Sequence, residues 1–171
     1  MHTRTETILA IDPGLRDLGY AILHGRRLVT SGVLGLRCVP KTERLPSARR
    51  HVRFWLRTHR PDVVVVEKTY RHPVPWLDQL HQLSGSARNL ATRQHATFNM
   101  YSPQSVRATV AGNGKAKKPE VAVAVAHRFP SLRVYLTQDR RWKERFWQNM
   151  FDAIALALHH QNATRPPSRG R

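Results

Sequence analysis

The sequence predicts an α/β fold in which helices flank a mixed five-stranded sheet. Residues 63–66 are four consecutive valines, a pattern typical of a strand covered on both faces at the centre of such a sheet. Ahead of this run, three short apolar segments follow one another with only turns between them, which indicates antiparallel pairing. After it, segments with helical spacing alternate with one further predicted strand.

The three opening strands are predicted over residues 7–11, 18–24 and 27–34. The first ends at Asp12, which is followed by a Pro-Gly pair, a strong turn signal. The second and third strands are separated by a short segment around Gly25, which suits a hairpin turn. The valine strand is predicted over 62–67 and ends in an acid, Glu67.

The first helix is predicted over residues 43–58, where apolar residues recur every three or four positions until Pro61 ends the pattern. Arginines occupy another face of this helix and indicate a general attraction for DNA rather than a specific site. These arginines are Arg49, Arg53, Arg57 and Arg60.

The later elements are predicted from apolar spacing and from capping residues. Ser102 followed by Pro103 suits the start of a helix, with serine as the N-cap. Residues 131–145 are heavily charged and receive no assignment. The predicted elements are a helix over 76–92, a strand over 97–101, and helices over 103–110, 119–128 and 146–160. A flexible basic loop is expected between the helices predicted over 103–110 and 119–128.

The charge balance predicts a nucleic acid partner, because 29 Lys and Arg residues face only 11 Asp and Glu residues, for a net charge of +18. Cys38 is the only cysteine, which excludes an intramolecular disulfide and a cysteine-based zinc finger. No apolar run approaches the roughly 20 residues of a membrane span. We therefore expect a cytoplasmic protein with one domain over residues 1–162 and a disordered basic tail over 163–171.

Three acids lie where chemistry is expected: Asp12 and Glu67 end predicted strands, and Asp152 sits among apolar residues of the last helix. If the first and fourth strands are neighbours, Asp12 and Glu67 emerge at one edge of the sheet, where a helix could add Asp152. Carboxylates gathered in this way suit Mg²⁺ or Mn²⁺, and two such ions can hydrolyse a phosphodiester. The alternative is that these acids form ordinary ion pairs with nearby arginines.

Four segments, in order along the chain, resemble the motifs of the RuvC family of Holliday junction resolvases. They are 8–22, which contains Asp12-Pro13-Gly14; 64–67, which ends at Glu67; 101–118, which contains Gly112-Asn113-Gly114-Lys115; and 151–157, which contains Asp152-Ala153. The resemblance covers about residues 7–160, nearly the whole chain.

The resemblance implies a ribonuclease H-like fold and a homodimer that cuts four-way DNA junctions with Mg²⁺, or Mn²⁺ in its place, at two ions per active site. By the matching motifs, Asp12, Glu67 and Asp152 are three of the four metal-binding acids. The fourth position, three residues before Asp152, is Asn149 here. Asn149 offers a carbonyl oxygen but no charge, so metal affinity or activity is expected to differ.

The basic residues of the third motif are predicted to contact DNA. Lys115, Lys117 and Lys118 lie on a Gly-containing loop, and ammonium groups suit phosphate contact. Lys118 matches a basic position of the family and is assigned to the scissile phosphate. The alternative is an ordinary solvated lysine cluster.

Three more residues are predicted to bind DNA. Tyr70 follows Glu67 by three positions, where the family carries an aromatic that inserts at the junction crossover. Arg71 could hold a flanking phosphate, and Arg16 belongs to the first motif. The alternative for Tyr70 is a ring packed on the protein's own surface.

The predicted helix over 76–92 carries an apolar seam, Trp76, Leu80, Leu83, Ala87 and Leu90. By the resemblance this helix forms the dimer contact, while its spacing alone indicates a helix that covers the sheet. Residues 131–147, longer and more basic than expected for the family, could add a DNA contact. Two other functions stay open at this point: a nuclease of the same fold acting on other branched DNA or RNA–DNA hybrids, and a junction-binding protein without catalysis.

Overall fold

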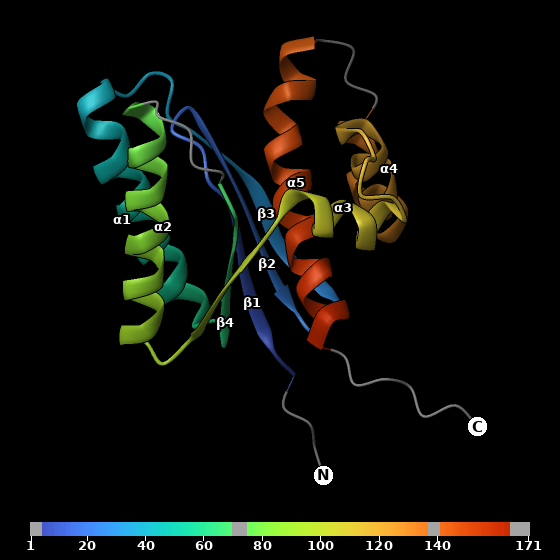
Figure 1. Cartoon of the computed structure of the whole chain (residues 1–171), viewed down its shortest axis with the longest axis horizontal. Coiled ribbons are helices and arrows are strands. Elements are labelled where there is room, and N and C mark those ends of the chain that lie inside the picture. Colours follow the sequence, from blue (N-terminus) through green and yellow to red (C-terminus); the bar gives the residue numbers. More distant parts are fainter. Residues whose placement is uncertain (1–4, 70–74, 137–140, 165–171) are drawn as a thin grey trace.

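The computed structural model describes residues 5–69, 75–136 and 141–164, and it places one five-stranded sheet between two layers of helices (Figure 1). The strand order is β3-β2-β1-β4-β5. The strands are β1 (Thr7–Asp12), β2 (Asp17–His24), β3 (Arg27–Gly35), β4 (Val63–Glu67) and β5 (Thr97–Tyr101). All five predicted strands are confirmed, each to within one residue at either end.

The pairing of the strands confirms the mixed sheet. β1 pairs antiparallel with β2 and parallel with β4, while β2 and β3 are antiparallel and β4 and β5 are parallel. β1 therefore lies between the antiparallel and the parallel half. The four valines of β4 are all buried, as expected for a strand covered on both faces.

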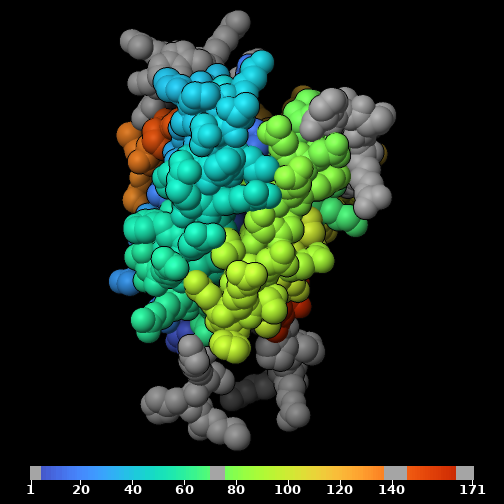
Figure 2. All heavy atoms as spheres, turned by 90° about the vertical axis from the view of Figure 1, so that its left-hand side faces the viewer, coloured from blue at the N-terminus to red at the C-terminus, as the bar shows by residue number. Residues whose placement is uncertain are grey.

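Two groups of helices cover the two faces of the sheet (Figure 1). On one face lie α1 (Lys41–His59) and α2 (Pro75–Arg93), whose outer surfaces run side by side in Figure 2. On the other face lie α3, α4 and α5, with a short 3₁₀ helix, η1. Their bounds are Pro103–Ala111 for α3, Lys118–Arg128 for α4, Pro130–Tyr135 for η1 and Arg141–Thr164 for α5.

Alternation along the strands divides the core into two clusters. In β1, Ile8 and Ala10 pack into the cluster with α5, whereas Leu9 and Ile11 pack into the cluster with α1. The valines of β4 alternate in the same way. Because successive side chains of a strand point to opposite faces, Asp12 and Glu67 both fall on the α5 face.

The seam predicted on α2 is partly wrong. Leu83 and Ala87 are buried against the sheet as expected, and Leu80 is buried as well. Trp76, however, is 58% exposed, and Leu77, only 5% exposed, takes the place predicted for it. A seam that starts at Leu77 keeps the helical spacing of the buried positions. Trp76 therefore belongs to the surface.

The segment predicted as a flexible basic loop contains a hydrogen-bonded turn. Gly112 ends α3 in the left-handed conformation, with φ of 73°. The Asn113 side chain accepts a hydrogen bond from the backbone N–H of Lys115 at 2.9 Å, and Ala116 is buried. The Ser102 N-cap is confirmed, since its side chain accepts from the backbone of Ser105.

The last helix is longer than predicted. α5 begins at Arg141 rather than 146 and continues through Thr164, two residues past the predicted end of the domain. The 3₁₀ helix η1 covers part of residues 131–145, the stretch that received no prediction from the sequence. Among the described residues, no helix combines the length and the apolar character needed to cross a membrane.

Candidate active site

Asp12 and Glu67 lie next to each other at one edge of the sheet. Each follows a paired position, because Ile11 of β1 is in register with Val66 of β4. Neighbouring strands are about 4.8 Å apart, and alternation turns both side chains toward α5. The prediction that these two acids emerge together is confirmed.

Asp152 joins them from α5, where it is held by two side chains. The Lys118 ammonium at the start of α4 donates to Asp152 Oδ2 at 2.9 Å. Gln148, one helical turn before Asp152, donates to Oδ1 at 2.9 Å. Asp152 is only 12% exposed, so both contacts compensate a carboxylate that is largely removed from water.

The acids affect one another electrostatically. Burial, followed by the charges of Glu67 and Asp152, raises the pKa of Asp12 well above its usual range. Burial, followed by the charge of Asp152, raises the pKa of Glu67 to about 7. Lys118 opposes both shifts, and Arg107 opposes that of Glu67. The three acids thus form one cluster in which burial and mutual repulsion disfavour full ionisation.

Lys118 is the positive counterpart of this cluster. Partial burial lowers the pKa of its ammonium, but the contact with Asp152 and the charges of Asp12 and Glu67 outweigh burial, and the pKa is raised. Lys118 therefore stays charged beside the acids. Asp152 is thus paired with a lysine, not with one of the many arginines.

The donor chemistry of the cluster fits a hard divalent cation, since it consists of carboxylate oxygens. Nevertheless, within residues 5–69, 75–136 and 141–164 no three His, Cys, Asp or Glu side chains are already placed as a metal cage. Lys118 provides positive charge at Asp152 instead.

Asn149 lies on the same side of α5, but its amide has a structural partner. Its Nδ2 donates to the backbone carbonyl of Asp17 at 2.7 Å, which ties α5 to the start of β2. Gly19 permits this approach, because a Cβ atom there would lie 1.9 Å from the carbonyl oxygen of Asn149. A carboxylate at position 149 could not donate this hydrogen bond.

The predicted DNA-binding residues are distributed around the cluster. Lys115 and Lys117 are exposed on the turn that leads to Lys118, and Arg16 is exposed on the loop after Asp12. Tyr70 and Arg71 lie outside the described residues. The structure thus brings four of the predicted basic residues to the acidic edge of the sheet or next to it.

Sequence reasoning missed Gln148 and Arg107. Gln148 stands four residues before Asp152, a spacing that places two helical side chains together and could have identified it. Arg107 affects Glu67 from α3, a relation between distant elements that no local spacing reveals.

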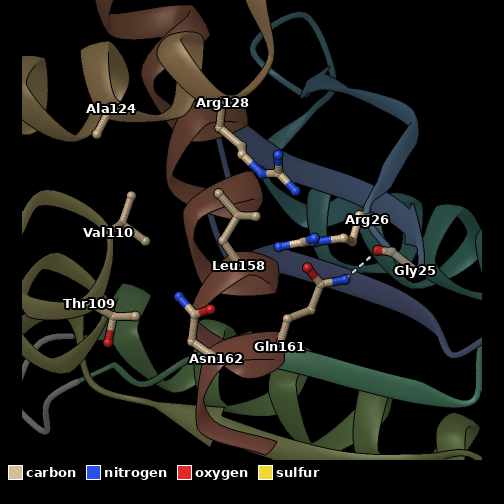
Figure 3. Close-up of a pocket in the computed structure, with 9 residues that line it drawn as sticks. All are labelled: Gly25, Arg26, Thr109, Val110, Ala124, Arg128, Leu158, Gln161 and Asn162. Carbon is tan, nitrogen blue, oxygen red and sulfur yellow. Dashed lines mark hydrogen bonds between the residues drawn. The ribbon is translucent and has the colours of Figure 1, made fainter. Parts of the chain in front are cut away.

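A separate cavity of about 470 Å³ lies at the other end of α5 (Figure 3). Arg26 and Arg128 reach toward it from the β2–β3 hairpin and the end of α4, and Gln161 donates to the carbonyl of Gly25. α4 runs 11 residues from Lys118 to Arg128, about 15 Å at the rise of a helix. None of the described residues lining the cavity is an acid, so it is not part of the carboxylate cluster.

Comparisons with known proteins agree on one family. A family model described as crossover junction endodeoxyribonuclease RuvC matches residues 8–160. Proteins of that name from Nocardioides sp. and Mycobacterium ulcerans are 35% and 30% identical over 160 residues, which is 90% of this chain and 85% and 82% of the relatives.

Solved structures show the same similarity. A structure described as T. thermophilus RuvC in complex with Holliday junction substrate has a TM-score of 0.73 and 26% identity, covering 94% of this chain and 95% of that one. The yeast mitochondrial Holliday junction resolvase Ydc2 shares the fold, with a TM-score of 0.66 and 16% identity over 91% of this chain and 77% of that one.

Proposed function

Because this chain belongs to the RuvC family of crossover junction endodeoxyribonucleases, we propose that Asp12, Glu67 and Asp152 form its catalytic centre. The protein is an endonuclease that resolves four-way DNA junctions, and the family is metal-dependent. The observation that carries the assignment is the gathering of three acids, two of them with raised pKa, at one edge of the sheet in a chain of charge +18.

The metal is Mg²⁺ or Mn²⁺, with two ions per site, held by Asp12, Glu67 and Asp152. When bound, such ions activate water and stabilise the charge that develops on the phosphate. Asn149 can add only its carbonyl oxygen, since its amide nitrogen is bonded to Asp17. The chain thus supplies three charges where the family motif supplies four.

Lys118 has two roles in this proposal. In the free protein it neutralises Asp152, and in the complex its ammonium is released toward the scissile phosphate. Because its pKa is raised, the Lys118 ammonium stays protonated in both roles. Gln148 keeps Asp152 in place through the exchange, because its hydrogen bond to Oδ1 does not involve the oxygen that Lys118 contacts.

The exposed Lys115, Lys117 and Arg16 attract the phosphates of the branched DNA that the protein binds. By the resemblance, Tyr70 stacks on a base at the crossover, and Arg71 beside it holds a flanking phosphate. One nuclease domain that continues past the predicted boundary at 162 to the end of α5 at Thr164, acting on DNA in the cytoplasm, completes this proposal.

A homodimer through α2 is proposed from the outer side of that helix. The inner side is used by the core, and the outer side is visible in Figure 2. A Cβ atom at Gly85 would meet nothing within 4 Å, so another helix could approach closely there. Two copies would present two centres to the two strands that must be cut.

The test compares cleavage of a synthetic four-way junction, a fork and an RNA–DNA hybrid in Mg²⁺ and in Mn²⁺. We expect symmetric cuts in the junction alone, and loss of cutting with unchanged binding for Asp12→Asn. Undiminished cutting by this variant would refute the catalytic centre. Binding without cutting by the wild-type protein in both metals would instead identify a junction-binding protein.

A further inference from the structure

A groove of about 670 Å³ opens beside the carboxylate cluster, and we name it the Trp76 groove. It is bounded by the loop after β1, the starts of α1 and α2, and one residue of α5. The lining residues that the argument uses are Leu15, Arg16, Lys41, Arg44, Trp76 and Leu80. Pro13, next to Asp12, also lines it, so the groove begins where the catalytic edge ends.

The rim of the Trp76 groove is positively charged. Arg16 and Lys41 are exposed, and Arg44 is fixed by hydrogen bonds to the carbonyls of Val39 and Arg37 at 3.0 and 3.2 Å. The one acid among the described lining residues, Asp17, is neutralised by Arg37 through Oδ2–Nε at 2.9 Å and a second contact to the same guanidinium. Three cations thus face the groove without a competing carboxylate.

Trp76 gives the groove an aromatic surface. Its side chain is 58% exposed, whereas Trp55 is 5% exposed and stacks on Tyr20 with ring centroids 4.3 Å apart. Leu80, 6% exposed, lies beside Trp76 among the lining residues. An exposed indole over an apolar floor and within a cationic rim matches a nucleotide, which combines a flat base with phosphates.

We propose that the Trp76 groove holds one unpaired nucleotide of the junction, with its base stacked on the indole and its phosphates between Arg16 and Lys41. The proposal rests on the proposed function, because it extends the path of the strand that is cut. A base inside a duplex is stacked on its neighbours, so the groove favours DNA that is open at a crossover. The volume is within the range of about 300–1,000 Å³ usual for ligand pockets.

The experiment measures binding without divalent metal, so that DNA stays intact. A four-way junction and a linear duplex of the same sequence are compared, with 2-aminopurine at the crossover of the junction. Trp76→Ala should weaken junction binding about tenfold and abolish the quenching of 2-aminopurine, with duplex binding unchanged within twofold. Trp76→Phe should retain most of the affinity, since it can still stack.

Substitutions of basic residues provide the second part of the binding experiment. Lys41→Ala should lower junction affinity and reduce its salt slope by about one. Arg26→Ala, at the separate cavity lined by the end of α4 (Figure 3), is the matched control and should affect junction and duplex equally. Because Trp76 and Lys41 are exposed, circular dichroism should show all variants folded.

The proposal is overturned if Trp76→Ala binds the junction like the wild type, or loses affinity equally for both DNAs. It is also overturned if Trp76→Ala shifts only the sedimentation of the protein, which would assign the indole to contact with a second copy. Cleavage by the wild type with Mg²⁺ is measured in parallel. Failure of that cleavage rejects the proposed function, whereas intact cleavage with unchanged binding by Trp76→Ala rejects the groove alone.

Discussion

At the Asp152 end of α5, three acids gather around one lysine, whereas at the His160 end two buried histidines each lie at hydrogen-bond distance from a hydroxyl group. His160 Nδ1 lies 2.8 Å from the Tyr101 hydroxyl, and His159 Nδ1 lies 2.7 Å from the Thr109 hydroxyl. His160 Nε2 also faces a carboxylate oxygen of Glu6 at 3.6 Å. These neighbours belong to different elements. Both histidines are buried with Nδ1 at hydrogen-bond distance from a hydroxyl, while His160 Nε2 has no hydrogen-bond partner among the described residues.

The two ends of α5 thus have different roles: the Asp152 end belongs to the functional site, and the His160 end belongs to the structural core. Neutral donors and acceptors can pair inside a protein at little cost, but like charges cannot. A cluster that keeps its acids together against burial and repulsion costs stability and indicates a site that awaits positive charge. The His160 end, in contrast, fixes the position of α5.

The largest effect that would test this comparison is expected for Glu67→Gln. Cleavage of a four-way junction should fall about a thousandfold, because the variant loses a metal-binding charge. The same change should raise the free energy of unfolding of the metal-free protein at pH 8, since a neutral amide is less costly to bury. Single-turnover cleavage and urea denaturation measure the two effects.

Glu43→Gln, at an exposed position in the first turn of α1, serves as the control. It should leave cleavage unchanged and, by removing a favourable charge at the helix N-terminus, lower the free energy of unfolding by about 0.5 kcal/mol. Opposite signs for activity and stability are the signature of the cluster. If Glu67→Gln lost stability as well as activity, Glu67 would be a structural residue.

The second effect is the pH dependence of stability without metal. Glu67 has a pKa of about 7 in the folded protein against 4.5 ordinarily, so its penalty is absent below pH 4.5 and grows as pH rises to 7, to about 3 kcal/mol. Burial lowers the pKa of His159 and His160, so their contribution to stability is lost as pH falls below 6.5. As pH rises, the acids at one end of α5 therefore lower the free energy of unfolding, whereas the histidines at the other end raise it.

Urea denaturation from pH 4.5 to 8 should reveal both slopes. Glu67→Gln should reduce the loss of stability toward pH 7 and leave the histidine slope. Part of the loss should persist, because burial also raises the pKa of Asp12. Adding Mg²⁺ should stabilise the wild type more at pH 8 than at pH 5.5, because protons compete with the cation at the acids. An equal effect of Mg²⁺ at both pH values would contradict binding at the cluster.

A smaller effect is expected for Lys118→Gln. Cleavage should fall about tenfold, because a half-exposed ammonium contributes less to a phosphate than a buried charge does. Lys117→Gln, its exposed neighbour, should change cleavage less than threefold. Equal effects of the two variants would show that Lys118 acts only through general attraction for DNA.

The smallest effect is expected at the His160 end. Tyr101→Phe removes the hydroxyl near His160 and should lower the free energy of unfolding by about 1 kcal/mol. Junction cleavage should stay within twofold of wild type. A large loss of cleavage with normal stability would connect this end of α5 to the reaction.

Local patterns predicted much of this architecture because they report local physics. The Pro-Gly turn after Asp12 and the valine run before Glu67 fix where two strands end, and parallel pairing then brings both acids together. Asp152 stands out as an acid among apolar residues of the last helix, and the resemblance of that segment to a family motif supports its assignment. These features needed no knowledge of distant contacts.

Contacts between distant segments could not be predicted in this way. Lys118 and Asp152 are 34 residues apart, and Asn149 reaches Asp17 across 132. The spacing of Trp76 fits a seam that either covers the sheet or forms a dimer contact, but Leu77 has the same periodicity, and the packing of α2 buries Leu77 rather than Trp76. A periodic pattern fixes a face of a helix only to within one neighbouring position.

The most direct test is a crystal structure of the protein soaked in Mn²⁺ at pH 8, with the ions located by anomalous scattering. We predict Mn²⁺ coordinated by Asp12, Glu67 and Asp152, with the Lys118 ammonium moved away from Asp152 and Asn149 still bonded to Asp17. Ions bound elsewhere, or a Lys118–Asp152 pair intact beside a metal-free cluster, would contradict the account.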